Sequence, residues 1–476
     1  MERTSLAAIA QVIWAKPPAG EVAPHLLASG VSIDSRTVKP GDLFFALPGQ
    51  RVDGHEYVES ALKAGAVAAV VSRVPEGFDP GEKADSVLLE VKDVLTALQD
   101  LAAWNRQRYN IPVVGVTGST GKTTTKDLIS AVLSRRFKTL KTSGNYNNEI
   151  GLPLTLMQLD GTHQAAVIEM AMRGPGEIAY LCSIARPSIG LITNIGHTHE
   201  ELLGSQENIA RAKMEILTNL PTEGWAVLNW DDLWLRKLAA RTRGSVMFYS
   251  ASGQPGIGEY EGEKITASDF RFAGKEGVRF LVRLGGQEQE VYLPVPGEHN
   301  ISNALGALAV GHLLGMRLEE MAEGLSEARL SAMRLDIKEG LNQTTIINDT
   351  YNANPDSMRA ALRVLSHLAA GRRVAVLGEM YELGDYAPEG HKIVGVEAAR
   401  QGVSLLVTVG DLAGYITEGA RSVGLPRERT AHFDDNRSAA DYLLRELVPG
   451  DTVLVKGSRG MKMEQIVAAL TEPPNS

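Results

Sequence analysis

Short apolar runs recur along the chain and alternate with stretches of helical periodicity. Three runs, at residues 165–169, 189–194 and 226–229, have the length and continuity of buried parallel strands. The segments between them repeat apolar positions every three or four residues, as amphipathic helices do. This alternation predicts a doubly wound parallel sheet in the middle of the chain.

The pattern changes at residues 268–294 and starts again near residue 330. Within 268–294, three segments alternate apolar with polar residues and are separated by glycines, which predicts an antiparallel meander added to the parallel sheet. After residue 330, four further strand-like runs separated by helical stretches predict a second open α/β domain. Those runs are residues 344–348, 373–378, 405–410 and 452–456.

The first 110 residues form a smaller block of mixed character. Leu95, Leu98 and Leu101 have helical spacing and predict a helix that links this block to the next. The predicted strands are residues 31–36, 41–47 and 66–71, with helices at 6–13 and 57–64. The chain is therefore predicted to be α/β with three domains: residues 1–110, with the linking helix; the central residues 111–328; and a C-terminal Rossmann-like domain, residues 329–476.

Composition narrows the possible roles. A chain of 476 residues with 44% hydrophobic and 22% charged residues is ordinary for a globular protein with several cores. No apolar run reaches the length needed to span a bilayer. The single cysteine, Cys182, excludes an internal disulfide and a cysteine-based metal cage, and fits a cytoplasmic setting. A net charge of −9 argues against a nucleic-acid partner, and nothing demands more than a monomer.

A glycine-rich turn between an apolar run and a helical segment is the strongest chemical signal. Residues 115–125 read Gly-Val-Thr-Gly-Ser-Thr-Gly-Lys-Thr-Thr-Thr. In such a turn the backbone N–H groups face phosphate oxygens, Lys122 reaches the β- and γ-phosphates, and Thr123 offers a hydroxyl to Mg²⁺. A plain glycine turn is the alternative, but the flanking strand and helix favour an ATP-binding P-loop. Its residues are Thr117, Gly118, Ser119, Thr120, Gly121, Lys122, Thr123 and Thr124.

Two further segments carry metal-binding side chains at strand ends. Glu169 ends the run 165–169 and, beside the P-loop strand, could bind Mg²⁺ directly or through water; a solvated strand end is an equal alternative. His199 follows the run 189–194, in a loop with His197. A His-Thr-His sequence is a weak metal signal, and a structural hydrogen bond is the commoner use of such a histidine.

Lys213 lies on the apolar stripe of a helix predicted over residues 207–220. Ile209 and Ile216 share this stripe. A lysine there usually extends along the core to reach water. Alternatively, burial lowers the pKa of its amine. A neutral amine could take up CO₂ as a carbamate and supply a carboxylate to a second Mg²⁺.

Several polar residues lie where open α/β sheets bind ligands. Asn300 and Asn303, three apart at a predicted helix start, could read an adenine edge or cap the helix. Arg334, residues 349–354 and residues 456–459 follow strand ends in the third block, where turn chemistry is the alternative.

Taken together, these motifs resemble the Mur ligase family of bacterial cell-wall synthesis over essentially the whole chain. The runs Asn-Tyr-Asn-Asn-Glu-Ile-Gly at 145–151 and Gly-Glu-Met-Tyr-Glu-Leu-Gly at 378–384 separate the chain from other members. The resemblance also covers residues 34–36, 41–47, 118–124, 144–153, 169–174, 199, 204–205, 212–213, 297–300, 348–355, 377–384 and 455–459. It implies ATP-driven addition of D-alanyl-D-alanine to UDP-N-acetylmuramoyl-tripeptide through an acyl phosphate, with the C-terminal domain binding the dipeptide.

The resemblance also implies roles for individual residues. It makes Glu169 and His199 ligands of Mg²⁺ together with Thr123, and Lys213 a carbamylated lysine, for two ions in all. The catalytic residues would be Lys122, Glu169, His199 and Lys213. Asn300 would contact adenine, with Arg334 and Asp349 completing the ATP site. Ser35 and Arg36 would hold the UDP end of the substrate, and Thr142, Asn145, Asn148 and Arg173 would face the muramoyl-peptide.

Two other functions remain open at this point. One is a different ligase of the same superfamily, such as folylpolyglutamate synthase or a Mur enzyme that adds single amino acids. The other is a nucleotide-switch module that hydrolyses ATP only to change shape. Phosphate release that depends on the dipeptide would exclude the first alternative, and an amide product would exclude the second.

Overall fold

The computed structural model describes residues 1–16, 26–49, 52–76, 78, 87–198, 200–253 and 256–472. Contacts between residues divide the chain into two compact units. The first contains Met1–Gly115, Phe137–Met172 and Glu177–Ile189, and the second contains Val116–Arg136, Arg173–Gly176 and Gly190–Ser476. No helix within the described residues is long and apolar enough to cross a membrane.

The first unit begins with a small parallel sheet in the order β3-β4-β5-β6. Phe44 and Val71 are buried in its core together with Ala61 of α2. The predicted strand 31–36 ends early, at Ser32, because Asp34 accepts a hydrogen bond from the Arg36 backbone and turns the chain. The elements are β1 (Thr4–Ser5), α1 (Leu6–Val12), β2 (Leu27–Ala28), β3 (Gly30–Ser32), β4 (Asp42–Phe45), α2 (Val58–Lys63), β5 (Ala68–Val71) and β6 (Val87–Glu90).

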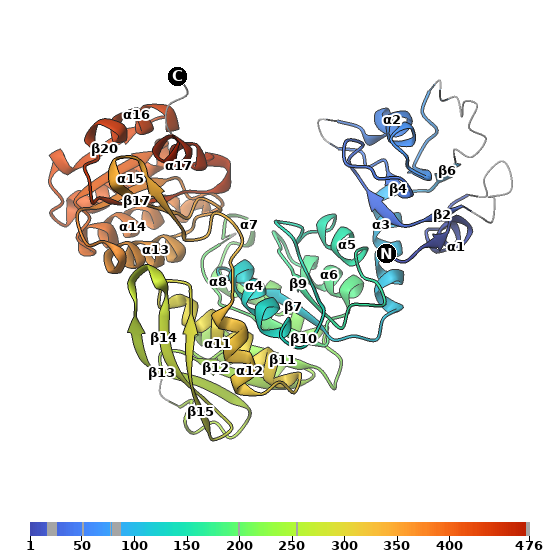
Figure 1. The fold of residues 1–476 in the computed structure, drawn as a ribbon, viewed down its shortest axis with the longest axis horizontal. Helices are drawn as coiled ribbons and strands as arrows, with labels where there is room; N and C mark the ends of the chain where they lie inside the picture. The colour runs from blue at the N-terminus through green and yellow to red at the C-terminus, as the bar shows by residue number, and fades with distance from the viewer. Residues whose placement is uncertain are drawn as a thin grey trace. The chain divides into compact units, whose positions relative to one another are not determined.

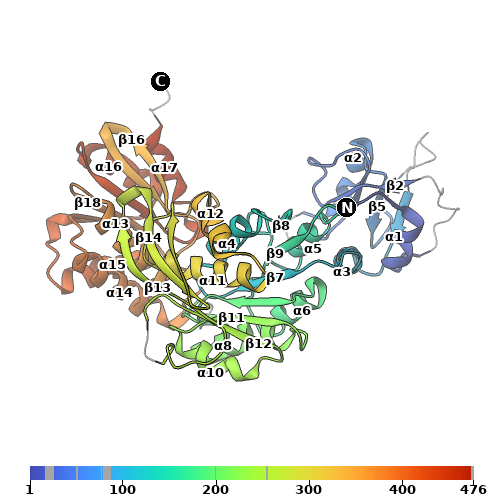
Figure 2. The same cartoon turned by 60° about the horizontal axis from the view of Figure 1, so that its bottom comes forward.

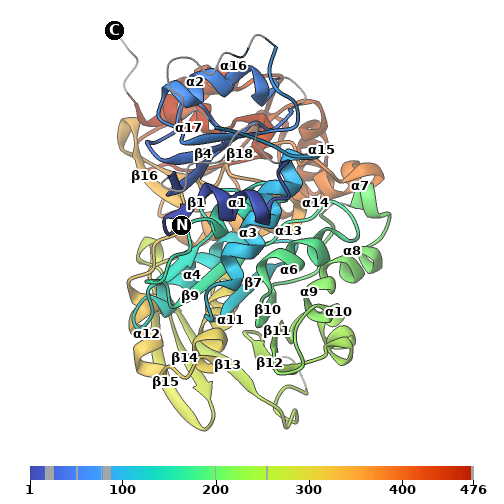
Figure 3. The same ribbon diagram turned by 90° about the vertical axis from the view of Figure 1, so that its right-hand side faces the viewer.

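The predicted linking helix is confirmed as α3 (Val94–Gln107), which begins at an Asp93 cap. α3 packs against α5 (Gly151–Leu156) and α6 (Glu177–Ala185), and Figure 3 shows it beside α6. Buried polar side chains fix the contact: Asn105 donates to Leu156 O (3.0 Å) and Arg106 donates to Ala185 O (3.0 Å). Such buried side-chain bonds to carbonyls anchor a helix more specifically than apolar contact alone.

The central sheet has nine strands in the order β15-β14-β13-β12-β11-β10-β7-β9-β8. The pairs β8–β9, β11–β12 and β12–β13 are parallel, whereas β13–β14 and β14–β15 are antiparallel, so the predicted meander is confirmed. Figure 2 shows the meander beside α11 and α12. The strands are β7 (Val113–Thr117), β8 (Thr139–Lys141), β9 (Ala165–Glu169), β10 (Ile189–Ile192), β11 (Trp225–Asn229), β12 (Ser245–Ser250), β13 (Lys264–Phe272), β14 (Val278–Leu284) and β15 (Gln287–Leu293).

One helix of the central region differs from the prediction. The helix expected over 207–220 is two helices, because the turn after Met214 tightens: Leu217 N donates to Met214 O, three residues back. The helices here are α4 (Lys122–Leu133), α7 (Glu200–Leu203), α8 (Gln206–Lys213), α9 (Glu215–Thr218), α10 (Leu233–Leu238), α11 (His299–Leu313) and α12 (Leu318–Ser326).

The C-terminal sheet has six strands in the order β16-β17-β21-β18-β19-β20. All its pairs are parallel except β16–β17. Its two faces bury separate cores, one under α13, α14 and α15 and the other under α16 and α17. Figure 1 shows α16 and α17 on one side of this region and α13 and α14 on the other. The elements are β16 (Asp336–Gly340), β17 (Thr344–Asn348), α13 (Pro355–Leu368), β18 (Arg373–Gly378), α14 (Ala387–Arg400), β19 (Leu405–Val409), α15 (Gly414–Ser422), β20 (Thr430–Phe433), α16 (Asn436–Glu446), β21 (Thr452–Lys456) and α17 (Glu464–Thr471).

Candidate nucleotide and metal site

The P-loop joins β7 to α4, and two of its residues can only be glycine. Gly118 has φ +146°, and a Cβ atom there would collide with Thr193 Oγ1. Gly121 has φ +79°, and its Cβ would lie 2.7 Å from Asn303 Oδ1. Both the backbone conformation and the close neighbours therefore exclude a side chain. This explains why the glycines stand at 118 and 121.

The P-loop presents positive groups at the start of α4. This helix begins at Lys122 after Gly121, and no side chain caps its N-terminus. The Lys122 amine donates to Gly118 O at 2.8 Å, so it lies over the loop. Asn194, which follows β10, binds the backbone of the P-loop: its Oδ1 accepts a hydrogen bond from Thr120 N at 3.0 Å. An uncapped helix N-terminus with a lysine above it is suited to bind phosphate.

Arg334 lies at the P-loop, as the resemblance implies. Its Nη2 donates to Thr123 Oγ1 at 2.7 Å, and its guanidinium lies 4.1 Å from the ring centre of Tyr351. The segment before it is tied to α4, since Asp127 Oδ2 accepts from both the N–H (2.8 Å) and the hydroxyl (2.7 Å) of Ser331. The predicted ATP-site residues Thr123 and Arg334 are therefore in direct contact.

Asp349 forms a buried ion pair that sequence reasoning did not assign. Its Oδ2 accepts from the Lys456 amine at 2.6 Å, and its Oδ1 accepts from Leu335 N at 3.2 Å. Burial lowers the pKa of Lys456, and the Asp349 carboxylate opposes that shift. The contact with Leu335 N means that Asp349 fixes the backbone next to Arg334. Lys456 lies in a run that the resemblance includes, but its partner is 107 positions away.

The asparagine pair at the start of α11 does not cap that helix. Asn300 is 1% exposed, and its amide donates to Pro296 O at 2.7 Å. Asn303 donates to Asn300 Oδ1 at 3.0 Å and accepts from Thr125 Oγ1 at 3.1 Å. The pair therefore connects α11 to α4. Its predicted contact with adenine stays a prediction.

Lys213 is buried at the end of α8, with 1% of its surface exposed. Burial, and secondarily the charge of Lys122, lower the pKa of its amine well below the ordinary value. The alternative in which the side chain extends to water is therefore wrong. His199, which the resemblance names as a metal ligand, lies outside the described residues.

Glu169, in the first unit, ends β9 with 2% of its surface exposed. Its Oε1 accepts from Asn147 Nδ2 at 2.8 Å, and its backbone N–H donates to Thr142 Oγ1 at 3.0 Å. Its Oε2 is buried and has no hydrogen-bond partner in the described part of the chain. A buried carboxylate oxygen without a donor fits a metal ligand, because leaving it unpaired is costly.

Within the described ranges, no three His, Cys, Asp or Glu side chains come together as a metal site. The predicted ligands do not require such a group. Apart from His199 they comprise one carboxylate, Glu169, one hydroxyl, Thr123, and one amine, Lys213, that would have to be modified first.

The predicted substrate-binding residues differ in their surroundings. Thr142 is buried and bonded to Glu169, whereas Asn148 Oδ1 accepts from Gly151 N (2.9 Å) at the start of α5. Asn145 and Arg173 are exposed. Arg36 pairs with Asp34 at 2.7 Å, and this hydrogen bond lowers the pKa of Asp34 to about 2; Ser35, between them, is half-buried.

A contact between the His197 segment and the turn before α14 was not predicted. His197 accepts or donates a 2.7 Å hydrogen bond with Glu200 and stacks on Tyr386, with ring centres 4.8 Å apart. Nearby, Gly384 has φ +52°, and a Cβ there would lie 2.9 Å from Glu201 Cα. The run 378–384, singled out in the sequence, thus leads into a close contact with the loop that carries His197.

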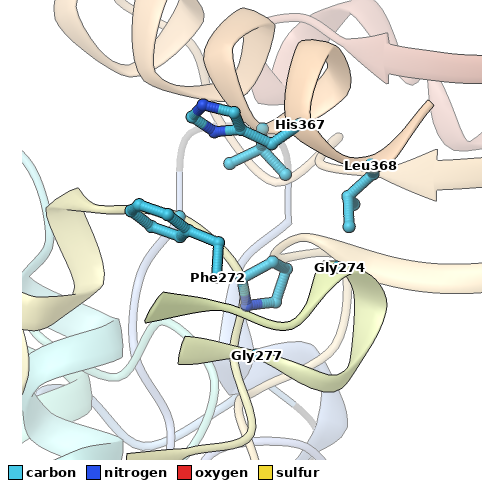
Figure 4. Close-up of a pocket in the computed structure, with 8 residues that line it drawn as sticks. Phe272, Gly274, Gly277, His367 and Leu368 are labelled. Carbon is cyan, nitrogen blue, oxygen red and sulfur yellow. The ribbon is translucent and has the colours of Figure 1, made fainter. Parts of the chain in front are cut away.

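Figure 4 shows a separate small hollow, between the β13–β14 connection and α13. Phe272 stacks on His367 there, with ring centres 5.1 Å apart. Its other lining residues are Gly274, Gly277, Pro296, Gly297, Val364 and Leu368. With one titratable side chain and an apolar lining, this hollow is no part of the candidate ATP site.

Three parts of the chain match descriptions of known protein families. Residues 116–311 match the Mur ligase middle domain, residues 333–459 match the Mur ligase glutamate ligase domain, and residues 28–106 match the Mur ligase family catalytic domain. The chain belongs to the Mur ligase family. The resemblance drawn from the sequence motifs is confirmed.

Individual Mur ligases are similar along nearly the whole chain. The UDP-N-acetylmuramoyl-tripeptide--D-alanyl-D-alanine ligase of Bacillus subtilis (strain 168) is 37% identical over 449 residues, 94% of each chain. The crystal structure of MurF from Acinetobacter baumannii has a TM-score of 0.85 at 31% identity and covers 99% of this chain and 100% of its own. MurF ligase from Thermotoga maritima in complex with ADP has a TM-score of 0.78 at 28% identity, covering 94% and 98%. The predicted α/β fold class is confirmed.

Proposed function

We propose that this Mur ligase joins D-alanyl-D-alanine to UDP-N-acetylmuramoyl-tripeptide and converts ATP to ADP and phosphate. The observation that carries the proposal is an intact P-loop in a chain that matches such a ligase over 94% of its length. A switch module that only hydrolyses ATP has no need of the two flanking α/β regions, both of which match Mur ligase domains.

The reaction takes two steps. The terminal carboxylate of the tripeptide attacks the γ-phosphorus, the bond to ADP breaks, and an acyl phosphate forms. The free amine of the dipeptide then attacks the acyl carbon, loses a proton and expels phosphate. A carboxylate and a triphosphate repel each other, so positive groups must offset their charge. Lys122 over the P-loop and Arg334 beside Thr123 are placed for this.

ATP is assigned to the P-loop, residues 117–124, with Asn300, Arg334 and Asp349 as further contacts. Asp349 acts on the site through the backbone at Leu335, which it holds next to Arg334. Lys456 neutralises Asp349 within the C-terminal sheet. Asp127 contributes by tying Ser331 to α4. These three contacts fix the segment that carries Arg334.

Mg²⁺ is assigned to Glu169, Thr123, His199 and the carbamate of Lys213, as two ions. When bound, Mg²⁺ supplies positive charge that offsets the repulsion between the reacting anions. Glu169 offers the unpaired Oε2. Thr123 offers a hydroxyl, which in this structure accepts a hydrogen bond from Arg334. Burial lowers the pKa of the Lys213 amine and so favours its neutral form, which can attack CO₂ and release one proton to form the carbamate.

The remaining substrates are assigned to the other regions. Ser35 and Arg36 bind the UDP end of the acceptor, and Thr142, Asn145, Asn148 and Arg173 line its muramoyl-peptide. The domains are residues 1–110, 111–328 and 329–476, of which the last binds the dipeptide. The enzyme acts as a cytoplasmic monomer.

The decisive assay is phosphate release with ATP, Mg²⁺, UDP-N-acetylmuramoyl-tripeptide and D-alanyl-D-alanine, omitting each reactant in turn. Release should require all four, and mass spectrometry should find the pentapeptide product. Release with D-alanine or L-lysine in place of the dipeptide would assign a different Mur activity. Release without either acceptor would instead indicate an ATPase.

Replacing Lys122 tests the assignment of the P-loop within this reaction. Lys122→Ala should lower kcat at least 100-fold, because the charge over the phosphates is lost, while the melting temperature stays unchanged. Lys138→Ala, at an exposed lysine of the first unit, is the matched control and should react at the wild-type rate. Turnover retained by Lys122→Ala would refute the assignment.

A further inference from the structure

We infer that Asn147 is a positioning residue, which orients the Glu169 carboxylate so that one oxygen is free for a metal ion. The inference rests on the proposed function, since that assigns Mg²⁺ to Glu169. The predicted site did not include Asn147, although the other asparagines of the run 145–151 were assigned to the substrate. Its amide donates to Glu169 Oε1 at 2.8 Å, and both residues belong to the first unit.

The loop holds Asn147 in place from both sides. Asn147 O accepts from Ala171 N at 2.9 Å, just beyond Glu169, and Asn147 N donates to Asn145 O at 2.8 Å. Further along, Gln99 on α3 donates to Glu149 O at 2.9 Å. The side chain that reaches Glu169 is therefore carried by a backbone that is itself bonded to the strand end of Glu169.

The effect on Glu169 is asymmetric. Thr142 Oγ1 fixes its backbone and Asn147 occupies Oε1, whereas Oε2 is buried with no donor among the described residues. An amide contributes a hydrogen bond without charge, so it fixes the rotamer and places no positive charge beside the carboxylate. Groups that orient a metal ligand in this way typically change metal affinity by about 10- to 100-fold when removed.

A purely structural role for Asn147 predicts a different result. The hydrogen bond would then only connect the loop to β9, and its loss would lower stability without affecting metal binding. Gln99→Ala is the matched control, because it removes another hydrogen bond from a side-chain amide to the same loop and leaves Glu169 untouched. The two variants separate loop anchoring from orientation of the carboxylate.

The test measures Mn²⁺ binding in the absence of turnover. The full-length protein is saturated with ADP, and electron paramagnetic resonance measures the Mn²⁺ that stays free. The Mn²⁺ bound by ADP alone is measured separately and subtracted. Asn147→Ala should raise the Mn²⁺ dissociation constant about tenfold, with ADP affinity in EDTA unchanged. Gln99→Ala should bind Mn²⁺ as the wild type does. Where Asn147→Ala does not fold, Asn147→Ser, too short to reach Glu169, takes its place.

The outcomes separate this inference from the proposed function. Wild-type Mn²⁺ affinity in a folded Asn147 variant would overturn the inference and leave the ligase assignment standing. An equal loss of affinity in Gln99→Ala would overturn it too, since loop anchoring would then explain the effect. Wild-type protein that binds Mn²⁺ with ADP but forms no amide would refute the proposed function alone. Wild-type protein that binds no Mn²⁺ would overturn the inference directly.

Discussion

Two of the predicted metal ligands are ionisable side chains that folding buries: the amine of Lys213 and the carboxylate of Glu169. Both are polar groups that folding removes from water at a cost. Oε2 of Glu169 has no hydrogen-bond partner among the described residues, and the like charge of Lys122 disfavours the protonated form of Lys213. Such groups are typical of sites whose ligands complete the pairing.

The lowered pKa of Lys213 predicts a pH dependence of stability. The unfolded chain holds this lysine protonated up to its ordinary pKa of about 10.5, while the folded chain releases the proton at lower pH. The unfolded state therefore binds more protons, and stability rises with pH between the two pKa values, by at most about 1.4 kcal/mol per pH unit. In CO₂-free buffer, the free energy of unfolding should rise more steeply with pH in the wild type than in Lys213→Met, at pH values below the ordinary lysine pKa of about 10.5.

Urea unfolding at several pH values measures both slopes. Lys138→Met, at an exposed lysine, is the control and should follow the wild type. Parallel curves for the wild type and Lys213→Met would contradict a lowered pKa. Readmitting bicarbonate should stabilise the wild type and not the Met variant, because only the amine can form a carbamate. The same chemistry predicts partial recovery of Lys213→Ala activity by added short carboxylates.

At the scale of elements, the apolar pattern identified buried strands well. The runs 165–169, 344–348, 373–378 and 452–456 match β9, β17, β18 and β21 residue for residue. These strands have helices or other strands on every side, so consecutive apolar residues fill their middle positions and polar residues stand at their ends. The edge strand β16, which carries Lys338 and Glu339, was not predicted, because its half-exposed side chains interrupt that signal.

The candidate site could be predicted only where its signal is local. The P-loop was found because its glycines, lysine and threonine are adjacent in the chain. Asp127 bonds to Ser331 across 204 positions, and Asn147 reaches Glu169 across 22. No periodicity or spacing encodes such pairs, since they depend on how separate loops meet. The break after Met214 was missed for a related reason, as the apolar stripe continues through it.

Replacing Gly118 tests how strictly ATP binding depends on the backbone conformation of the P-loop. Gly118→Ala should lower stability by more than about 2 kcal/mol and abolish ATP binding, because a Cβ there meets Thr193 Oγ1 at a strained φ. Gly286, in the β14–β15 turn, also has positive φ (+82°) but nothing within 4 Å of its Cβ. Gly286→Ala should cost only about 1 kcal/mol and leave ATP binding unchanged.

Chemical unfolding and calorimetry with ATP would measure both variants. The difference between them reports the close approach to Thr193 together with the difference in backbone strain between φ +146° and φ +82°. Equal destabilisation of the two variants would show that Thr193 yields to the added methyl group, against the expectation.

At the scale of the whole molecule, contacts within the second unit join the P-loop to the C-terminal sheet. Ser331 is tied to α4, Arg334 reaches Thr123, and Asp349 holds Leu335. The His197–Tyr386 stack is a second connection, formed by a different loop. A ligase needs such connections, because activated acid and incoming amine must meet in one geometry.

Tyr386 provides the test of this second connection. Tyr386→Ala removes the ring on His197 and should lower kcat/KM for D-alanyl-D-alanine about tenfold, since an aromatic stack contributes about 0.5–1.5 kcal/mol. Tyr386→Phe keeps the ring and should react within twofold of the wild type. Affinity for ADP should stay constant in both, because the P-loop contacts are untouched. Steady-state kinetics at varied dipeptide with saturating ATP measures the effect. A loss shared by the Phe variant would assign the role to the hydroxyl, and unchanged kinetics in Tyr386→Ala would mean that the stack does not help position the dipeptide.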